Sequence, residues 1–140
     1  MSVEENKAKQ RRVFEELLSK GNLAIIPELI APNYVVRNPL GMEVKGPEGF
    51  KQMVAMFRTA FPDMYATIDD MFAEGDKVAT RFTWRGTFKG EMMGIKPTGK
   101  KFTLTGILIT RWVSGKEVEA WEAYDMLAFY QQLGIPIPSQ

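Results

Sequence analysis

The spacing of hydrophobic residues changes once along the chain, from a helical period before residue 62 to a two-residue alternation after it. In the first part, a capping-box pattern at Ser2 and Glu5 precedes apolar residues at helical spacing, which continue to Gly21. A Gly-Pro pair at 46–47 begins another apolar stripe, which ends before Pro62. The pattern predicts helices over residues 2–21, 22–32 and 47–61, with a short strand over 33–39.

The second part of the chain predicts two β-hairpins, because β-branched and aromatic residues alternate there with polar ones. The first hairpin covers residues 65–88 and turns at 74–77, the second covers 100–125 and turns at 113–115, and a last helix follows over 126–134. Helices followed by a long antiparallel sheet are typical of an α+β domain, with the helices packed on one face of the sheet. We therefore expect one domain over residues 1–140.

Both faces of the second hairpin are unusually apolar for a sheet with one side in water. On its first strand Leu104, Leu108 and Trp112 share one face, whereas Ile107 and Ile109 share the other. Antiparallel sheets normally keep one face solvated, so a second apolar face indicates a second cover. We expect helices to cover one face and a second copy of the chain to cover the other, which would make the protein a homodimer.

The charge balance excludes several classes of partner. The 140 residues include 18 basic and 17 acidic side chains, and a net charge of +1 gives no field that would attract nucleic acid. No apolar run approaches the roughly 18–20 residues needed to cross a bilayer, and the first residues lack the apolar core of a signal peptide. We expect a cytoplasmic protein that binds neither nucleic acid nor membrane.

The sequence contains neither cysteine nor histidine. Thiol nucleophiles, disulfides, thiolate or imidazole metal sites and imidazole-based catalytic triads are therefore excluded. Proton transfer near neutral pH is left to a buried carboxyl group with a raised pKa, a buried lysine with a lowered pKa, or a tyrosine. Acid–base chemistry in this chain is expected to use Asp or Glu.

The second hairpin brings acids and aromatic residues to one face of the predicted sheet. A three-residue loop at 113–115 pairs Trp112 with Lys116 and places Arg111 opposite Glu117 as a cross-strand ion pair. A shorter loop or a bulge would change these partners. The face that contains Arg111 also carries Ile107, Ile109, Glu119, Trp121 and Asp125.

Asp125 allows two interpretations. If its face is the one that the helices cover, the carboxyl lies at the wall of a cavity, and burial raises its pKa into the range of an acid–base catalyst. Asp125 also lies where a strand ends and a helix begins, and Asp is among the best residues for capping a helix N-terminus. The pattern alone leaves both open.

An ordered series of motifs carries a family resemblance over nearly the whole chain: "FPD", "GDKVA", "GT-x-x-GE-x-MGI-x-PTGK" and "W-x-x-x-D…QQLG". The sequence resembles the SnoaL-like polyketide cyclases of the nuclear transport factor 2-like superfamily. The resemblance implies a cone-shaped α+β barrel, usually dimeric, with a hydrophobic pocket between the helices and the concave face of the sheet. It also implies that Asp125 is the acid–base residue of an intramolecular aldol closure, without metal or cofactor.

The chain departs from the family pattern where related sequences usually carry histidine, since it has Arg37 and Phe88 at those positions. Arginine is permanently charged, so Arg37 or Arg111 is a candidate for holding a developing oxyanion but not for moving a proton. The alternative for each is an exposed or ion-paired cation.

Other predicted contacts with a small hydrophobic substrate come from apolar residues. Trp121 is expected to form a wall of the pocket, and the same face carries Ile107 and Ile109. Met92 and Met93 lie in a Gly-rich connection and form either an adaptable lid over the ligand or ordinary core packing.

Three functions fit these observations. The first is a cyclase, or a related lyase or isomerase, that acts on a hydrophobic carbonyl compound with Asp125 as the acid–base group. The second is a dimeric protein that binds a small molecule without catalysis, which the missing histidines favour. The third is a hydrolase similar to the epoxide hydrolases of the superfamily.

Overall fold

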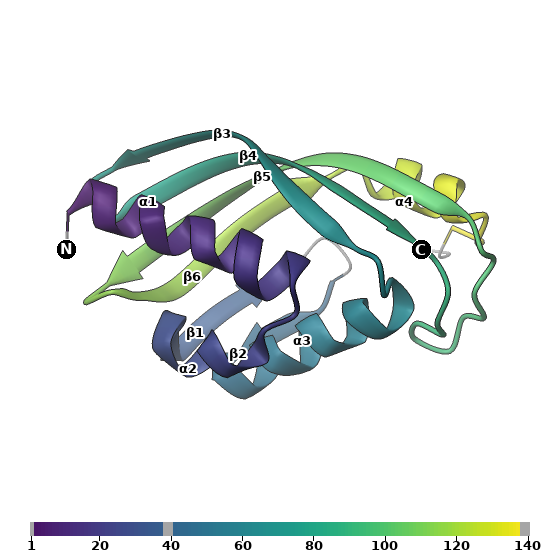
Figure 1. Cartoon of the computed structure of the whole chain (residues 1–140), viewed down its shortest axis with the longest axis horizontal. Coiled ribbons are helices and arrows are strands. Elements are labelled where there is room, and N and C mark those ends of the chain that lie inside the picture. The colour runs from purple at the N-terminus through teal and green to yellow at the C-terminus, as the bar shows by residue number, and fades with distance from the viewer. Residues whose placement is uncertain (1, 38–40, 138–140) are drawn as a thin grey trace.

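The computed structural model describes residues 2–37 and 41–137, except for the side chain of Arg37 (Figure 1). The helical elements are α1 (Val3–Arg12), the π-helical segment η1 (Val13–Ser19), the short 3₁₀ turn η2 (Leu23–Ile25), α2 (Ile26–Leu29), α3 (Gly46–Ala60) and α4 (Met126–Leu133). The strands are β1 (Ile30–Arg37), β2 (Glu43–Lys45), β3 (Tyr65–Glu74), β4 (Lys77–Thr87), β5 (Lys101–Val113) and β6 (Lys116–Tyr124).

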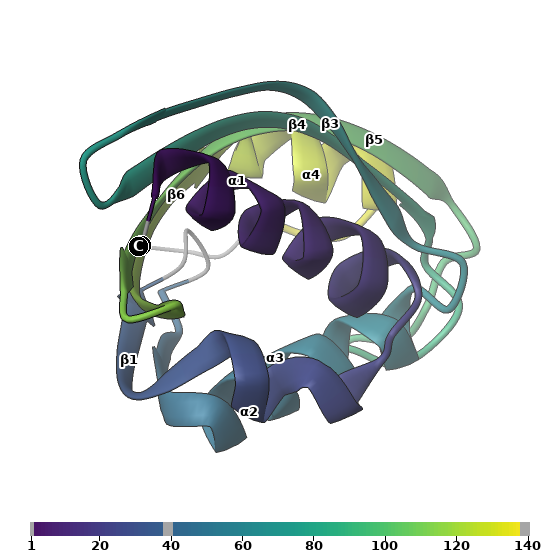
Figure 2. The same cartoon turned by 60° about the vertical axis from the view of Figure 1, so that its left-hand side comes forward.

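The strands form one curved sheet in the order β2-β1-β6-β5-β4-β3. All neighbouring strands are antiparallel except β1 and β6, which pair in parallel. Figure 2 shows β3, β4 and β5 curving over α1, while α2 and α3 lie on the other side of α1 from these strands. The predicted α+β class, with helices on the concave face of the sheet, is confirmed.

The predicted helices and hairpins are present, and the differences in element boundaries lie in the first half of the chain. The first helix becomes π-helical from Val13, and the short second helix ends at Leu29 because β1 already begins at Ile30. The strand β2 was missed; it pairs Val44 with Val36 of β1 and forms one edge of the sheet. Its three residues are too few to show an alternating pattern.

Two apolar clusters make up the core. One joins η1, α2 and α3 to the sheet and includes Leu17, Leu29, Val54 and Trp112. The other lies at the α4 end and consists largely of aromatic residues, including Phe61, Phe88, Phe102 and Phe129. The helix α4 is fixed in this second cluster by Phe129, whose ring stacks on Trp84 with 5.5 Å between centroids.

The turn between β5 and β6 has two residues rather than the predicted three. Val113 pairs with Lys116, and both central residues have positive φ, 50° at Ser114 and 82° at Gly115. Two consecutive positive φ angles define the type I′ geometry, whose twist matches that of a hairpin. The predicted pair of Trp112 with Lys116 is therefore wrong by one residue.

Candidate functional site

A pocket of about 100 Å³ lies between the helices and the concave face of the sheet. Its lining draws on both core clusters and is almost entirely apolar or aromatic. It consists of Val13, Phe14, Leu18, Tyr34, Val36, Phe50, Met53, Phe57, Met64, Tyr65, Ala66, Phe82, Trp84, Leu108, Glu117, Ala120, Glu122 and Tyr124. No described side chain among them is cationic.

The helical wall of the pocket comes partly from the π-helical segment η1. Its Val13, Phe14 and Leu18 all line the pocket, and such segments are frequent at functional sites. Ser19, at the end of η1, is held to β3 because its hydroxyl accepts a hydrogen bond of 3.0 Å from the Ala66 amide. This contact positions the end of the helix at the rim of the pocket.

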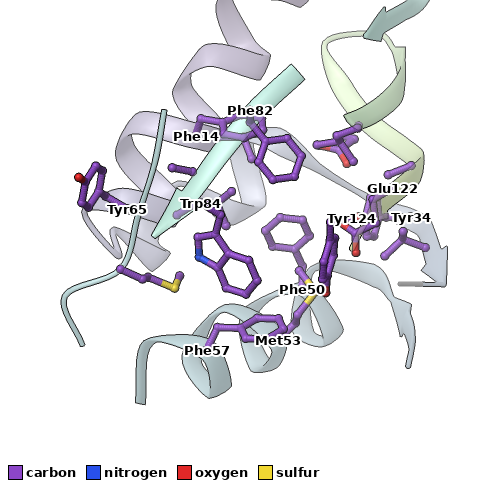
Figure 3. A pocket seen from close by; sticks show the side chains of 18 residues that line it. Phe14, Tyr34, Phe50, Met53, Phe57, Tyr65, Phe82, Trp84, Glu122 and Tyr124 are labelled. Carbon is purple, nitrogen blue, oxygen red and sulfur yellow. The ribbon is translucent and has the colours of Figure 1, made fainter. Parts of the chain in front are cut away.

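The rim at β3 is the most open part of the lining. Tyr65 is 47% exposed, and the Arg85 guanidinium lies 5.5 Å from the centre of its ring. Figure 3 shows Tyr65 at one side of the pocket, away from Glu122, Tyr34 and Tyr124 on the other. A ligand that enters past Tyr65 would therefore reach a polar group of side chains at the far wall.

A β-bulge in β6 brings one acid of that group to the inner face. Trp112 pairs with Glu117 but Arg111 pairs with Glu119, so Val118 is the extra residue. Successive residues of a regular strand alternate between faces, and one extra residue reverses the alternation. Glu117 thus lies on the inner face with Trp112, whereas Glu119 lies on the outer face with Arg111.

Glu117 is buried to 2% exposure and lines the pocket. The Tyr34 phenol hydrogen-bonds to its carboxyl group, and Oε1 of Glu117 has no hydrogen-bond partner among the described residues. Burial, with a smaller contribution from the charge of Glu122, raises the pKa of Glu117 to about 8. At neutral pH Glu117 is therefore mostly a neutral carboxylic acid.

Glu122 is the second acid of the pocket, five residues further along β6. It pairs with Leu108 of β5, and burial raises its pKa to about 7. The neighbouring Tyr124 is largely buried, and burial together with the charge of Glu122 raises its phenol pKa far above the ordinary value. Glu122 is therefore the carboxyl that exchanges a proton closest to neutrality.

Asp125 does not lie in this pocket. The residue is exposed, and its Oδ1 accepts a hydrogen bond of 3.0 Å from the Ala128 amide as the N-cap of α4. The expected burial of Asp125 among apolar groups is wrong, because its face of the hairpin points away from the helices. The capping interpretation is confirmed, and the catalytic assignment implied by the resemblance stays a prediction.

The other residues predicted on the face of Arg111 also lie outside the pocket. Ile107 is 53% exposed, Ile109 36% and Trp121 46%. Trp121 borders a separate open hollow on the outer side, between β1 and β6. The expectation that these three residues line the enclosed pocket is wrong because the helices cover the opposite face.

Arg111 is an ion-paired cation of the outer face. Its Nε lies 2.6 Å from Oε1 of Glu119, and its Nη1 lies 3.8 Å from the carboxylate of Asp76. The prediction that Arg111 pairs with Glu117 is wrong, because the two-residue turn and the bulge together shift the register of β5 against β6 by two residues. Arg111 therefore does not reach a substrate oxygen in the pocket.

The remaining predicted contacts divide between the core and the surface. Met92 is completely buried in the aromatic cluster, whereas Met93 is 51% exposed in a turn. Neither lines the pocket, so the lid interpretation is not supported and core packing describes Met92. The backbone of Arg37 ends β1 opposite Glu43, but its side chain lies outside the described part of the structure.

Sequence reasoning missed Glu117, Glu122 and Tyr34. A signal for Glu122 was present, because its pairing partner Leu108 belongs to the more apolar face of β5, which is the face that a core covers. Glu117 gave no such signal. Its inward direction depends on a bulge that the residue pattern does not reveal.

No cluster of three potential metal ligands occurs among residues 2–37 and 41–137. Within the same residues, no helix is long and apolar enough to span a membrane. What the pocket offers chemically is one carboxyl that titrates near neutrality, one neutral carboxyl and three phenols, in largely apolar surroundings.

Comparison with known proteins identifies the class to which this fold and pocket belong. The family model of the SnoaL-like polyketide cyclases matches residues 8–133, and the chain belongs to that family. A protein with a ketosteroid isomerase-like fold from Catenulispora acidiphila superimposes with a TM-score of 0.77, covering 91% of this chain and 93% of that chain. At 18% identity this likeness concerns the fold alone.

Two relatives have higher sequence identity to this chain. The aklanonic acid methyl ester cyclase AcmA of Streptomyces galilaeus is 31% identical over 128 residues, which cover 88% of this chain and 87% of that protein. A solved structure from Acidithiobacillus ferrooxidans is also 31% identical, has a TM-score of 0.82, and covers 96% of this chain and 98% of that chain. The chain is thus a member of the polyketide cyclase family, at about 30% identity to these relatives.

Proposed function

We propose that this protein catalyses an intramolecular aldol closure of a hydrophobic polyketide-type carbonyl compound, with Glu122 as the acid–base group. The observation that carries the proposal is the position of Glu122 in an apolar pocket, where burial raises its pKa to about 7. A group with a pKa near the working pH is both sufficiently ionised to take a proton and sufficiently acidic to return it.

The reaction needs only a proton that leaves and returns. The Glu122 carboxylate removes a proton from the carbon next to one carbonyl, and the resulting enolate carbon attacks a second carbonyl carbon of the same molecule. The C–C bond closes the ring, and the new alkoxide takes the proton back from Glu122. Substrate and product have the same composition, so the step requires no oxidant, reductant or cofactor.

The pocket favours an uncharged reacting group. Two carboxyl groups and no described cation line it, so a carboxylate on the substrate would meet repulsion without a counter-charge. The relative AcmA is named for a methyl ester. A volume of about 100 Å³ is below the roughly 300–1,000 Å³ typical of sites for larger ligands, so the bulk of a polyketide would extend past Tyr65 or displace flexible side chains such as Met53.

A product-mass assay tests the proposal. Purified protein is incubated with aklanonic acid methyl ester and related polyketide esters. The products are separated by liquid chromatography, and their masses are measured by mass spectrometry. Cyclisation yields a product of unchanged mass with a new ring. In a parallel incubation with a hydrophobic epoxide, a diol heavier by one water would instead support an epoxide hydrolase-like reaction. Binding without any product in either incubation would support the non-catalytic alternative.

We further propose that a second copy of the chain covers the outer face of the sheet. What supports this is a group of exposed apolar side chains on strands of the sheet, here called the outer patch. It consists of Val35, Phe72, Ile107, Ile109, Val113 and Trp121. Apolar surface of this kind, outside the substrate pocket, is typical of an interface between subunits.

A further inference from the structure

We propose that Glu117, oriented by Tyr34, is a second catalytic residue, which donates a hydrogen bond from its neutral carboxyl to the carbonyl oxygen that becomes the enolate. This inference rests on the proposed aldol closure and assigns the group that stabilises its developing negative charge.

The geometry of Glu117 supports a donor role. Its side chain is almost fully buried and lines the pocket, and its Oε1 has no hydrogen-bond partner among the described residues. A buried polar atom without a partner destabilises a fold, so proteins rarely keep one without a reason. A substrate oxygen in the pocket would supply the missing partner.

Tyr34 provides the orientation. It lies on β1, whose residue Ile30 pairs with Glu117 across the parallel seam, and its phenol hydrogen-bonds to the Glu117 carboxyl. The high pKa of the buried Tyr34 phenol keeps its proton in place, so the phenol donates to one carboxyl oxygen. The other oxygen of Glu117 can then carry the acid proton toward the ligand.

The two acids have complementary states near neutral pH. Glu122 is partly ionised and can accept a proton, whereas Glu117 retains its own because its pKa is about 8. Each acid charge disfavours the other, so the pair loses its protons in two separate steps. A neutral carboxylic acid in an apolar site is a strong hydrogen-bond donor to an oxyanion, which is the role proposed here.

The test compares Glu117→Gln with Glu117→Leu in steady-state kinetics across pH. Gln keeps an uncharged donor at this position, and Leu removes it while filling the space. If Glu117 acts as a neutral donor, the kcat/KM of wild type should fall above pH 8 as Glu117 ionises. We expect Glu117→Gln to retain kcat within about tenfold and to lack this fall. Removal of a single oxyanion donor typically costs about 10²–10³, which is the expected loss for Glu117→Leu.

Two kinetic results would overturn the inference. If Glu117→Gln lost as much activity as Glu117→Leu while both variants stayed folded by circular dichroism, Glu117 would act as a base. If Glu117→Leu kept wild-type kcat, Glu117 would not take part. Tyr34→Phe should lower kcat. The rise of activity as pH increases toward 7, which reflects the ionisation of Glu122, should remain.

A binding measurement separates this inference from the proposed function. The probe is 4-nitrophenol, a planar mimic of an enolate whose ionised oxygen changes its absorbance. We expect wild type and Glu117→Gln to bind it alike and Glu117→Leu to bind at least tenfold more weakly. Equal binding by all three proteins would overturn the donor role, whereas the expected binding pattern without turnover of any polyketide ester would overturn only the cyclase reaction.

Discussion

The two faces of the β5–β6 hairpin carry similar residue types in opposite environments. The inner face presents Glu117 and Glu122 to an apolar pocket, whereas the outer face holds Glu119 in an ion pair with Arg111 and leaves Trp121 exposed. Proximity in sequence is no guide here, since Glu122 adjoins Trp121 directly. The comparison teaches that the strand face, together with one bulge, decides whether a carboxyl is a surface charge or a proton donor.

The largest expected effect comes from removing the inner acid that titrates near neutrality. Glu122→Gln keeps the size of the side chain and abolishes its proton exchange, so kcat should fall about 10²–10⁴-fold with the fold intact. The matched control at the end of the same hairpin is Asp125→Asn, which should keep turnover within a few-fold. Loss of turnover in Asp125→Asn with Glu122→Gln active would instead favour the assignment implied by the family.

The next effect concerns stability and pH. Because the pKa of Glu117 is raised in the folded state, its protonated form stabilises the fold at low pH, and this contribution is lost as pH rises from about 4.5 to about 8. The free energy of unfolding of Glu117→Gln relative to wild type should therefore increase by about 1.4 kcal/mol per pH unit across that window. Urea unfolding at several pH values measures it.

A flat difference between Glu117→Gln and wild type over the same pH range would mean that Glu117 is solvated in the folded state.

A third effect is expected at the outer patch. Ile107→Asp places a charge in the proposed subunit interface and should weaken dimerisation at least tenfold, as measured by analytical ultracentrifugation. Leu127→Asp is a matched control, because Leu127 is similarly exposed, at 51% against 53%, but lies on α4 outside the outer patch. A monomeric wild type, or equal effects of the two variants, would contradict the proposed dimer.

The smallest effect belongs to the helix cap. Asp125→Ala removes the hydrogen bond to the Ala128 amide and should cost about 1 kcal/mol of stability, whereas Asp125→Asn keeps a capping oxygen and should cost almost nothing. Thermal unfolding of the two variants measures the difference. An equal loss in both would show that the charge of Asp125, rather than its capping geometry, matters to the fold.

The same comparison explains how much of the molecule could be predicted from the sequence. Helical and alternating periods predicted α1, α3, α4 and both hairpins, and they predicted that Glu119 and Trp121 share a face with Arg111. The pattern did not decide which face the helices cover, although the apolar stripe through Leu104, Leu108 and Trp112 indicated it. Choosing the other face placed the candidate site on the wrong side of the sheet.

The position of Glu117 could not be read from the pattern. A type I′ turn at Ser114 and Gly115 and the bulge at Val118 each shift the register by one residue. The two shifts together preserve the predicted alternation from Glu119 onward and reverse it for Lys116 and Glu117. The family motif directed attention to Asp125, and only the three-dimensional environment distinguishes that cap from the buried acids.

The most direct test of the central claim is a ¹³C NMR titration of the glutamate side-chain carboxyl carbons, with Glu117→Gln and Glu122→Gln to assign the two signals. The account predicts that Glu122 titrates near pH 7 and Glu117 near pH 8, because both carboxyls are buried in the pocket. Titration of both groups in the ordinary range, around pH 4.5, would contradict it.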